Sequence, residues 1–222
     1  MTFRLTSVLG SVAVLISACA TQTQPPPAAV LEISDKSCSG SVKLTEWTDL
    51  QPQRKRKHHS TLAIVDQTTP CIEVDGEHRN YVLFKLPEIR KQNLVLTVGG
   101  YKEAIRTLAG RVVVLAEDGT PTRTFGPSDY MSRSNAHAVQ FRPRESEHFI
   151  LVETDPAMVG DAVSSLQQQL TQSQNNVYTG GTYTGTYSTY SGHERSSRRV
   201  YSHEGVILVR LQAIDGHIGI AE

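Results

Sequence analysis

Several residue types that mark common functional classes are scarce in this 222-residue sequence. It contains three cysteines and one tryptophan, and its 22 Lys and Arg are matched by 22 Asp and Glu. Because this balance leaves no overall positive field, we expect no nucleic-acid partner. No Cys-x-x-Cys, His-Glu-x-x-His, Gly-x-Ser-x-Gly or phosphate-loop motif occurs. The sequence therefore predicts a non-enzymatic protein with no catalytic residue, no metal site and no cofactor.

Long apolar runs are also scarce, and the clearest one, residues 8–16, follows Arg4. This run is shorter than the roughly 20 apolar residues that span a bilayer, so it predicts a secretory signal peptide at residues 1–18. The order Ile16-Ser17-Ala18-Cys19 resembles the bacterial lipobox, in which the cysteine is acylated and becomes the new N-terminus. An ordinary secretory signal with a chance cysteine is the alternative. Because Ala20 stands where Asp would suggest retention in the inner membrane, we predict a palmitate-bearing lipoprotein of the outer membrane that faces the periplasm.

The segment after the lipobox predicts a tether, and the two cysteines that follow the tether predict a disulfide. Residues 19–37 are polar and include three consecutive prolines, a composition that suits an extended spacer between the membrane and a folded domain. Cys38 and Cys71 are the two other cysteines. In an oxidising periplasm they are expected to form a disulfide, with a pair of metal or redox thiols as the alternative.

Short strands separated by turn residues fill most of the remaining chain. Each strand contains β-branched or aromatic residues and ends near Pro, Gly or an Asp-Gly pair. The runs are 61–65, 81–86, 94–98, 112–115, 122–125, 139–142, 148–152 and 206–211. This pattern favours a mainly β fold, an antiparallel β-sandwich over residues 38–214 that is followed by a tail at 215–222.

One amphipathic helix is predicted over residues 155–172, on the end of the sandwich. Asp155 and Pro156 suit the N-cap and the first helical position. The apolar residues that follow recur at helical spacing, although Gly160 weakens the pattern. They are Met158, Val159, Ala162, Val163, Leu166 and Leu170.

Residues 173–199 form an insert that is rich in Tyr, Thr, Ser and Gly. Because Val177 is its only aliphatic residue, the preferred interpretation is a flexible, partly exposed loop. A second interpretation is a set of aromatic rings that stack on a glycan or a partner surface, and a third is a strand hairpin of alternating Tyr and Thr. The ligand-binding candidates are Tyr178, Tyr183, Tyr187 and Tyr190. Trp47 is expected to pack in the core rather than to serve as a sugar platform.

A series of strand and turn segments carries a resemblance to a known family. The segments are 81–87, 93–98, 112–121, 125–130, 149–155 and 203–209. In this order they resemble the maltose-operon periplasmic protein family, exported proteins that are encoded beside genes for maltose uptake. The resemblance implies a β-rich exported domain that assists carbohydrate uptake or envelope organisation, and it supplies no catalytic residue. The expected partners are the outer membrane, through the lipid anchor, and an envelope protein or a glycan.

Overall fold

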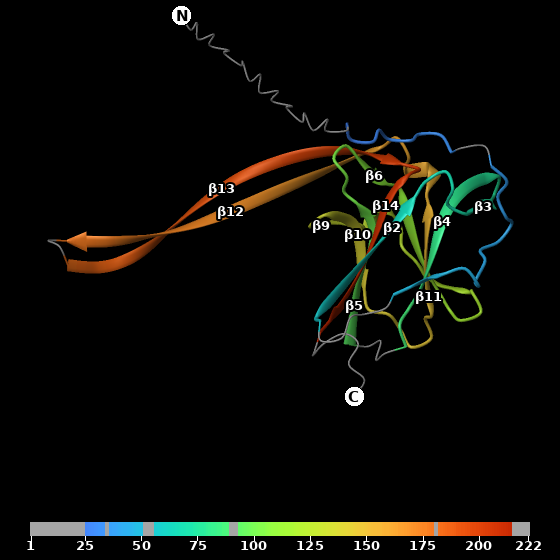
Figure 1. Ribbon diagram of the computed structural model, residues 1–222, viewed down its shortest axis with the longest axis horizontal. Helices are drawn as coiled ribbons and strands as arrows, with labels where there is room; N and C mark the ends of the chain where they lie inside the picture. The colour runs from blue at the N-terminus through green and yellow to red at the C-terminus, as the bar shows by residue number, and fades with distance from the viewer. Residues whose placement is uncertain (1–24, 34–35, 51–55, 89–92, 180–181, 215–222) are drawn as a thin grey trace, which may run out of the picture.

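The computed structural model of the chain describes residues 25–33, 36–50, 56–88, 93–179 and 182–214, and within residues 165–196 it describes the backbone alone. Strands make up most of this region (Figure 1). The helical elements that it contains are short 3-10 turns such as η2 (Pro127–Asp129) and η3 (Pro156–Met158). The prediction of a mainly β fold is confirmed, and each of the eight predicted strands has a counterpart among the observed ones.

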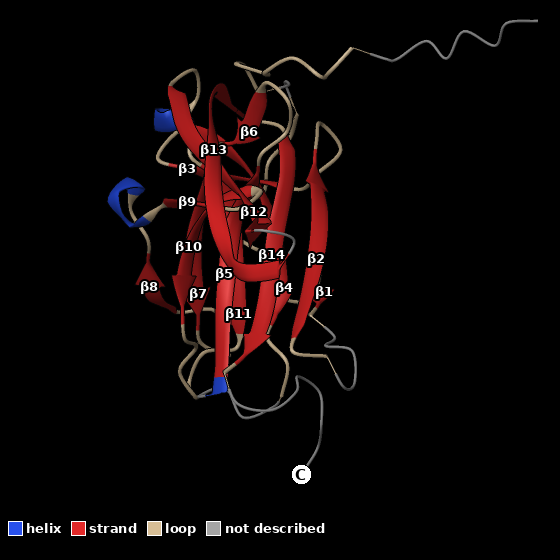
Figure 2. Ribbon diagram, turned by 90° about the vertical axis from the view of Figure 1, so that its left-hand side faces the viewer, coloured by secondary structure: helices blue, strands red, loops and turns tan. Residues whose placement is uncertain are grey.

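Two sheets face each other as a sandwich (Figure 2). The first sheet has the order β1 (Thr48–Asp49), β4 (Glu77–Lys85), β11 (Phe149–Thr154), β7 (Gly110–Leu115) and β8 (Pro121–Thr124), and β3 (Cys71–Val74) pairs with the start of β4. The second has the order β2 (His58–Val65), β14 (Gly205–Ala213), β5 (Leu94–Tyr101), β10 (Ala136–Phe141) and β9 (Met131–Arg133). Within these sheets β1 pairs parallel with β4, and the other pairs are antiparallel.

The main core lies between the two sheets. Because successive side chains of a strand point to opposite faces, every second residue of the central strands enters this layer. Phe84 and Ile150 of the first sheet and Leu96 and Val209 of the second are fully buried there. The runs of apolar residues in β7 and β11 need a second layer, because their intervening side chains point to the outer face.

That second layer is the outer face of the first sheet. Leu83, Val113 and Leu151 are buried on it, and Val42 and Leu44 of the preceding chain pack against them. We call residues 28–33 and 36–50 the N-terminal strap, because they precede β2 and their later part, with Val42 and Leu44, covers this face. A sheet that is covered on both faces explains why β7 and β11 are continuously apolar rather than alternating.

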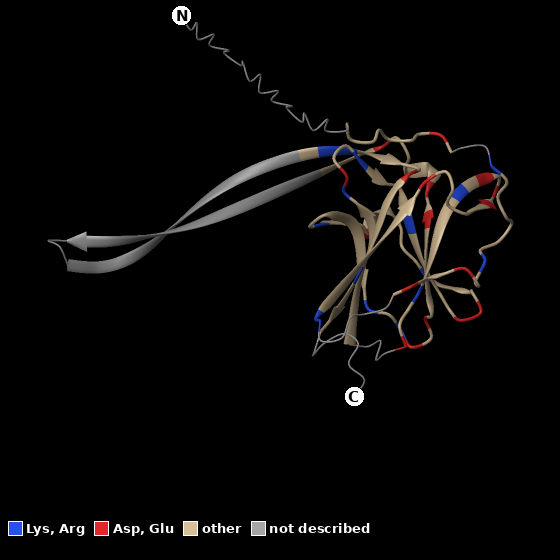
Figure 3. Ribbon diagram, in the orientation of Figure 1, with Lys and Arg blue, Asp and Glu red and all other residues tan. Residues whose placement is uncertain are grey.

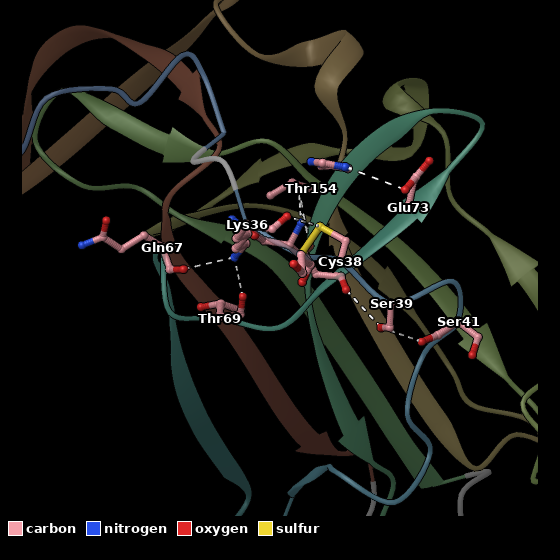
Figure 4. Close-up of a disulfide and its surroundings, with 12 residues drawn as sticks. Lys36, Cys38, Ser39, Ser41, Gln67, Thr69, Glu73 and Thr154 are labelled. Atoms are coloured by element: carbon pink, nitrogen blue, oxygen red, sulfur yellow. Dashed lines mark hydrogen bonds and ion pairs between the residues drawn. A yellow bond between two sulfur atoms is a disulfide. The ribbon is translucent and has the colours of Figure 1, made fainter.

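A disulfide between Cys38 and Cys71 fixes the N-terminal strap to β3, as predicted (Figure 4). Ser39 continues the attachment, since its N–H donates to the Cys71 carbonyl at 3.0 Å and its carbonyl accepts from the Glu73 N–H at 3.0 Å. Lys36 donates to the carbonyls of Gln67 and Thr69 on the neighbouring turn. Burial lowers the pKa of the Lys36 ammonium, against the opposing effect of nearby carboxylates.

The helix predicted over residues 155–172 is wrong. Its start signal is present, because the Asp155 carboxylate accepts a hydrogen bond from the Ala157 N–H at 3.1 Å, but the turn ends at Met158. Gly160 then adopts a φ of 90°, a left-handed conformation that stops a helix. Its N–H donates to the Tyr201 carbonyl at 3.0 Å. This long-range pairing turns the following residues into a strand.

That strand opens a long hairpin where the sequence favoured an irregular loop. β12 (Ala162–Thr179) and β13 (Thr182–Ser202) pair antiparallel, and β13 pairs in parallel with β6 (Arg106–Leu108) at its end. The hairpin projects away from the sandwich as a twisted ribbon (Figure 1). The loop interpretation of residues 173–199 is therefore wrong, and the strand hairpin is the alternative that the structure supports. The flexibility of this insert stays a prediction.

Candidate functional site

The hairpin of β12 and β13 collects the predicted binding residues in its distal half. Tyr178 pairs with Tyr183, Asn175 with Tyr187, and Gln172 with Tyr190. At about 3.3 Å per residue, β12 spans roughly 60 Å, so these tyrosines lie tens of ångströms from the sandwich. The strand register brings these residues, which come from two separate stretches of the sequence, into one segment, and their role in binding stays a prediction.

Charge is absent from most of the hairpin. No Asp, Glu, Lys, Arg or Pro occurs between residues 162 and 192, while Glu194, Arg195, Arg198 and Arg199 follow toward the base. In the sandwich, acidic and basic residues are interspersed (Figure 3). Between residues 162 and 192 the ribbon therefore contains no carboxylate and no imidazole of the kind that a hydrolytic site uses.

The base of the hairpin is held by hydrogen bonds from three consecutive residues of β13. The Val200 N–H donates to the Ile105 carbonyl at 3.1 Å, and the Tyr201 N–H donates to the Asp161 carbonyl at 2.9 Å. Arg199 donates through Nε to the Glu103 carbonyl. Because these bonds join β13 to two separate segments, the base is part of the folded body.

The N-terminal strap reaches this same base. The Val30 N–H donates to the Ser202 hydroxyl at 2.8 Å, and the His203 N–H donates to the Val30 carbonyl at 2.9 Å. Arg106 adds a bond from Nη1 to the Ala28 carbonyl at 3.1 Å. The chain that comes from the predicted lipid anchor is thus fastened where the hairpin leaves the sandwich. Cys19 itself lies outside the described residues.

Three aromatic side chains pack below the hairpin base. The ring centroid of His137 lies 5.7 Å from that of Tyr130 and 5.8 Å from that of Tyr201. Burial raises the pKa of Tyr201 to about 12, and it also raises the pKa of Tyr130, whose hydroxyl accepts a hydrogen bond from the Val112 N–H at 2.9 Å. Burial, helped by Lys102, lowers the pKa of His137. A neutral imidazole between two neutral phenols supports the hairpin as packing and has no charge to share with a substrate.

A hollow of about 370 Å³ lies on the outer face of the first sheet. Val113, Leu115 and Leu151 line it, and Arg111 and Glu153 are among its polar lining residues. The Glu153 carboxylate lies 3.1 Å from Arg79 Nη1 and 3.4 Å from Arg111 Nε. At this end of the hollow each charge faces an opposite charge, and Asp118 adds a further carboxylate to the lining, so the hollow does not favour an anion.

Trp47 was predicted to pack in the core, and this prediction is wrong. Its side chain is 41% exposed rather than buried in the core. It is oriented by a hydrogen bond from Nε1 to Asp49 at 3.1 Å, and the Lys85 ammonium lies 5.2 Å from its ring centroid. A smaller hollow of about 270 Å³ lies beside it, lined also by Glu46 and Tyr81.

The described part of the chain holds no group of three His, Cys, Asp or Glu residues that could bind a metal ion. Nor, in the same region, is any helix long and apolar enough to cross a membrane. Comparison with protein-family models, curated proteins and solved structures gives no match. The resemblance to the maltose-operon periplasmic proteins therefore stays a prediction.

Proposed function

We propose that this protein is a non-enzymatic, lipid-anchored accessory protein of the bacterial envelope, and that it acts by binding through the β12–β13 hairpin. The observation that carries the proposal is the ribbon itself, which projects from a disulfide-fixed sandwich and is fastened at its base to the N-terminal strap. A projecting ribbon of this kind presents free strand edges to a partner. By its family resemblance, the process that it assists is carbohydrate uptake or envelope organisation.

The body of the sandwich supports a binding role more than a catalytic one. The two buried carboxylates Glu147 and Glu153 are held by arginines, and His137 is packed between tyrosines. A general acid or base needs a side chain that can give or take a proton and that faces a substrate. In the described region these groups instead complete internal contacts, so the hairpin remains the strongest candidate for function.

A shortened hairpin tests this proposal. Replacing residues 167–195 with Asn-Gly leaves Leu166 opposite Ser196, keeps the base register of Ser164 with Arg198, and removes the distal ribbon. Photo-crosslinkers placed at Tyr183 or Tyr187 of the long form should capture an envelope partner, and growth on maltodextrins should slow in cells that carry the short form. The matched control places the crosslinker at Thr61 in β2. Normal growth of the short form, together with equal capture from Thr61, would remove the hairpin from the function.

Carbohydrate binding is the second candidate, because the strand register gathers four tyrosines in the distal half of the hairpin and because Trp47 is exposed beside a hollow. A glycan array distinguishes the two surfaces. Tyr183→Ala with Tyr187→Ala should abolish binding if the hairpin is the sugar site, whereas Trp47→Ala should abolish it if the hollow is. An array on which the unaltered protein binds nothing argues against this candidate.

A further inference from the structure

The outer edge of β12 is one of two long strand edges of the described hairpin that have no neighbour, and the other is the edge of β13 before Val200. Among the described strands only β13 pairs with β12, and β13 itself pairs with β6 solely over its last three residues, Val200 to Ser202. An edge strand presents a row of backbone donors and acceptors that can pair with another chain. With 18 residues, β12 offers an edge several times the length of an ordinary strand.

The sandwich protects its own edges, and the hairpin does not. The edge strands β8 and β9 have four and three residues, and they carry Pro121, Arg123 and Arg133. β2 is longer, with eight residues, but it lies against β4 of the opposite sheet. Short length, proline and charge are the usual means by which proteins prevent pairing between edges. β12 has none of these features, because its sequence contains no Pro, Asp, Glu, Lys or Arg.

The two edges of the hairpin differ in the same respect. β13 contains Glu194, Arg195, Arg198 and Arg199, and it also contains Gly185 and Gly192, which weaken a strand. β12 contains neither charge nor glycine. Charged residues therefore oppose pairing along the base-proximal part of the β13 edge, whereas no charged residue opposes pairing along the edge of β12.

A further pair of strands would also stabilise the ribbon. A two-stranded ribbon in water is marginally stable, and fixing each residue costs about 1–2 kcal/mol of backbone entropy. Beyond the base, the sequence of β12 has only Leu166, Leu170 and Val177 as aliphatic residues. Pairing along the free edge would add hydrogen bonds over the whole length without any new apolar core.

We infer that the free edge of β12 pairs antiparallel with β12 of a second copy of this protein, forming a four-stranded sheet of two hairpins. Two identical edges of equal length satisfy each other about a two-fold axis, and the resulting contact closes as a dimer. The absence of charge means that the copies do not repel each other. This inference specifies a partner for the hairpin of the proposed function.

The position of the tether favours such a dimer on a membrane, and this step rests on the proposed lipid anchor. Ala28 is bonded at the hairpin base and lies nine residues after Cys19, so the base stays within about 30 Å of the anchor. All copies would then hold their hairpins in one layer above the bilayer. Confinement to a layer raises the effective concentration of the edges for each other.

A charge-exchange experiment tests the pairing. The mature protein is purified in detergent, and its association is measured by sedimentation velocity. Gln168→Lys with Gln172→Lys should raise the dimer dissociation constant about tenfold or more, since like charges would meet across the new contact. Gln168→Glu with Gln172→Glu should do the same. An equimolar mixture of the two variants should restore the dimer, which also shows that both are folded.

The matched control places two lysines on one face of the other strand, at Thr186 and Ser188 of β13, and should leave the dimer intact. A scan of single cysteines along β12, carried out in membranes, should give disulfide-linked dimers that peak at one position, where the two-fold axis passes. A monomer at all concentrations, equal loss of dimer in the β13 control, or crosslinking to a different envelope protein alone would each overturn the inference. The last result would still support the proposed binding function of the hairpin, so the two proposals fail separately.

Discussion

Glu147 shows how this protein keeps a charged side chain in its interior. The residue is fully buried, and its carboxylate accepts hydrogen bonds from Arg123 at 2.6 and 2.8 Å, from the Arg144 N–H at 2.7 Å and from Thr122 at 3.2 Å. Burial alone would raise the pKa of Glu147, but these donors, Arg123 foremost, hold it below its usual range. The carboxylate therefore stays ionised at neutral pH.

Replacing this carboxylate should reveal its contribution. At pH 7 we expect Glu147→Gln to lower the free energy of unfolding by about 3 kcal/mol, because it leaves the Arg123 guanidinium without its charged partner. Since the folded pKa is depressed, the stabilisation is present at neutral pH and is lost as the pH falls through that pKa. Urea titrations at pH 7 and at acidic pH should thus show the difference between the two proteins shrinking in acid. Glu117→Gln, at an exposed position, serves as the control and should change little.

The two buried tyrosines below the hairpin base allow a second test at this scale. Because the folded pKa of Tyr201 is about 12, its phenol should stay protonated while exposed tyrosines ionise near 10. An ultraviolet titration of the native protein should therefore show the same step near pH 10 in Tyr201→Phe as in the unaltered protein. A smaller step in the variant would contradict the burial of this phenol.

Single-residue predictions from the sequence succeeded where chemistry was local and failed where it depended on distant partners. Cys38 and Cys71 could be paired because the predicted export and an even cysteine pair suffice for the inference. The burial of Glu153 could not be foreseen, since its partner Arg79 is 74 positions away. Trp47 was misplaced for a similar reason, because its exposure depends on how the N-terminal strap crosses the sheet.

At the scale of elements, the strands of the sandwich were predictable because β-branched runs and turn residues specify them locally. Residues 155–172 were not, since their apolar spacing fits a helix and only the pairing of β12 with β13 decides otherwise. Gly160 was the clue in the sequence, and its left-handed conformation separates the short turn η3 from the strand. The strand hairpin of Tyr and Thr was weighed as an alternative, but its length was not foreseen.

The disulfide is the element whose removal should affect the N-terminal strap most. Cys38→Ser with Cys71→Ser should lower the free energy of unfolding by about 3–4 kcal/mol, because the bond closes a loop with a sequence separation of 33. Guanidinium titrations of the variant and of the reduced native protein should agree. The mature native protein without reductant is the reference, and an unchanged midpoint would mean that the strap is held by its other contacts alone.

At the scale of the whole molecule, the decisive prediction concerns attachment. Cys19→Ala should move the exported protein from the membrane fraction to the soluble fraction, because the acyl chains that anchor it, at about 0.8 kcal/mol per buried CH₂, can no longer be added. Ser17→Gly keeps a small residue in the lipobox and is the control that should remain with the membrane. Sedimentation of the Cys19→Ala protein with membranes would show that another surface provides the attachment.

The N-terminal strap also determines how the molecule responds to mechanical load. A pull on the segment before Pro25, such as an anchor in a moving membrane would exert, enters the folded body first at Ala28 and Val30. If those hydrogen bonds rupture, the strap can peel away only as far as Cys38, where the covalent bond to Cys71 in β3 transfers the force to the sandwich. Residues between Cys38 and Cys71, including the part of the strap that covers Val113 and Leu151, are thereby shielded from tension. Under load, the hydrogen bonds at the hairpin base would break first, and the disulfide would keep the strap attached to the sandwich, so the core would stay folded.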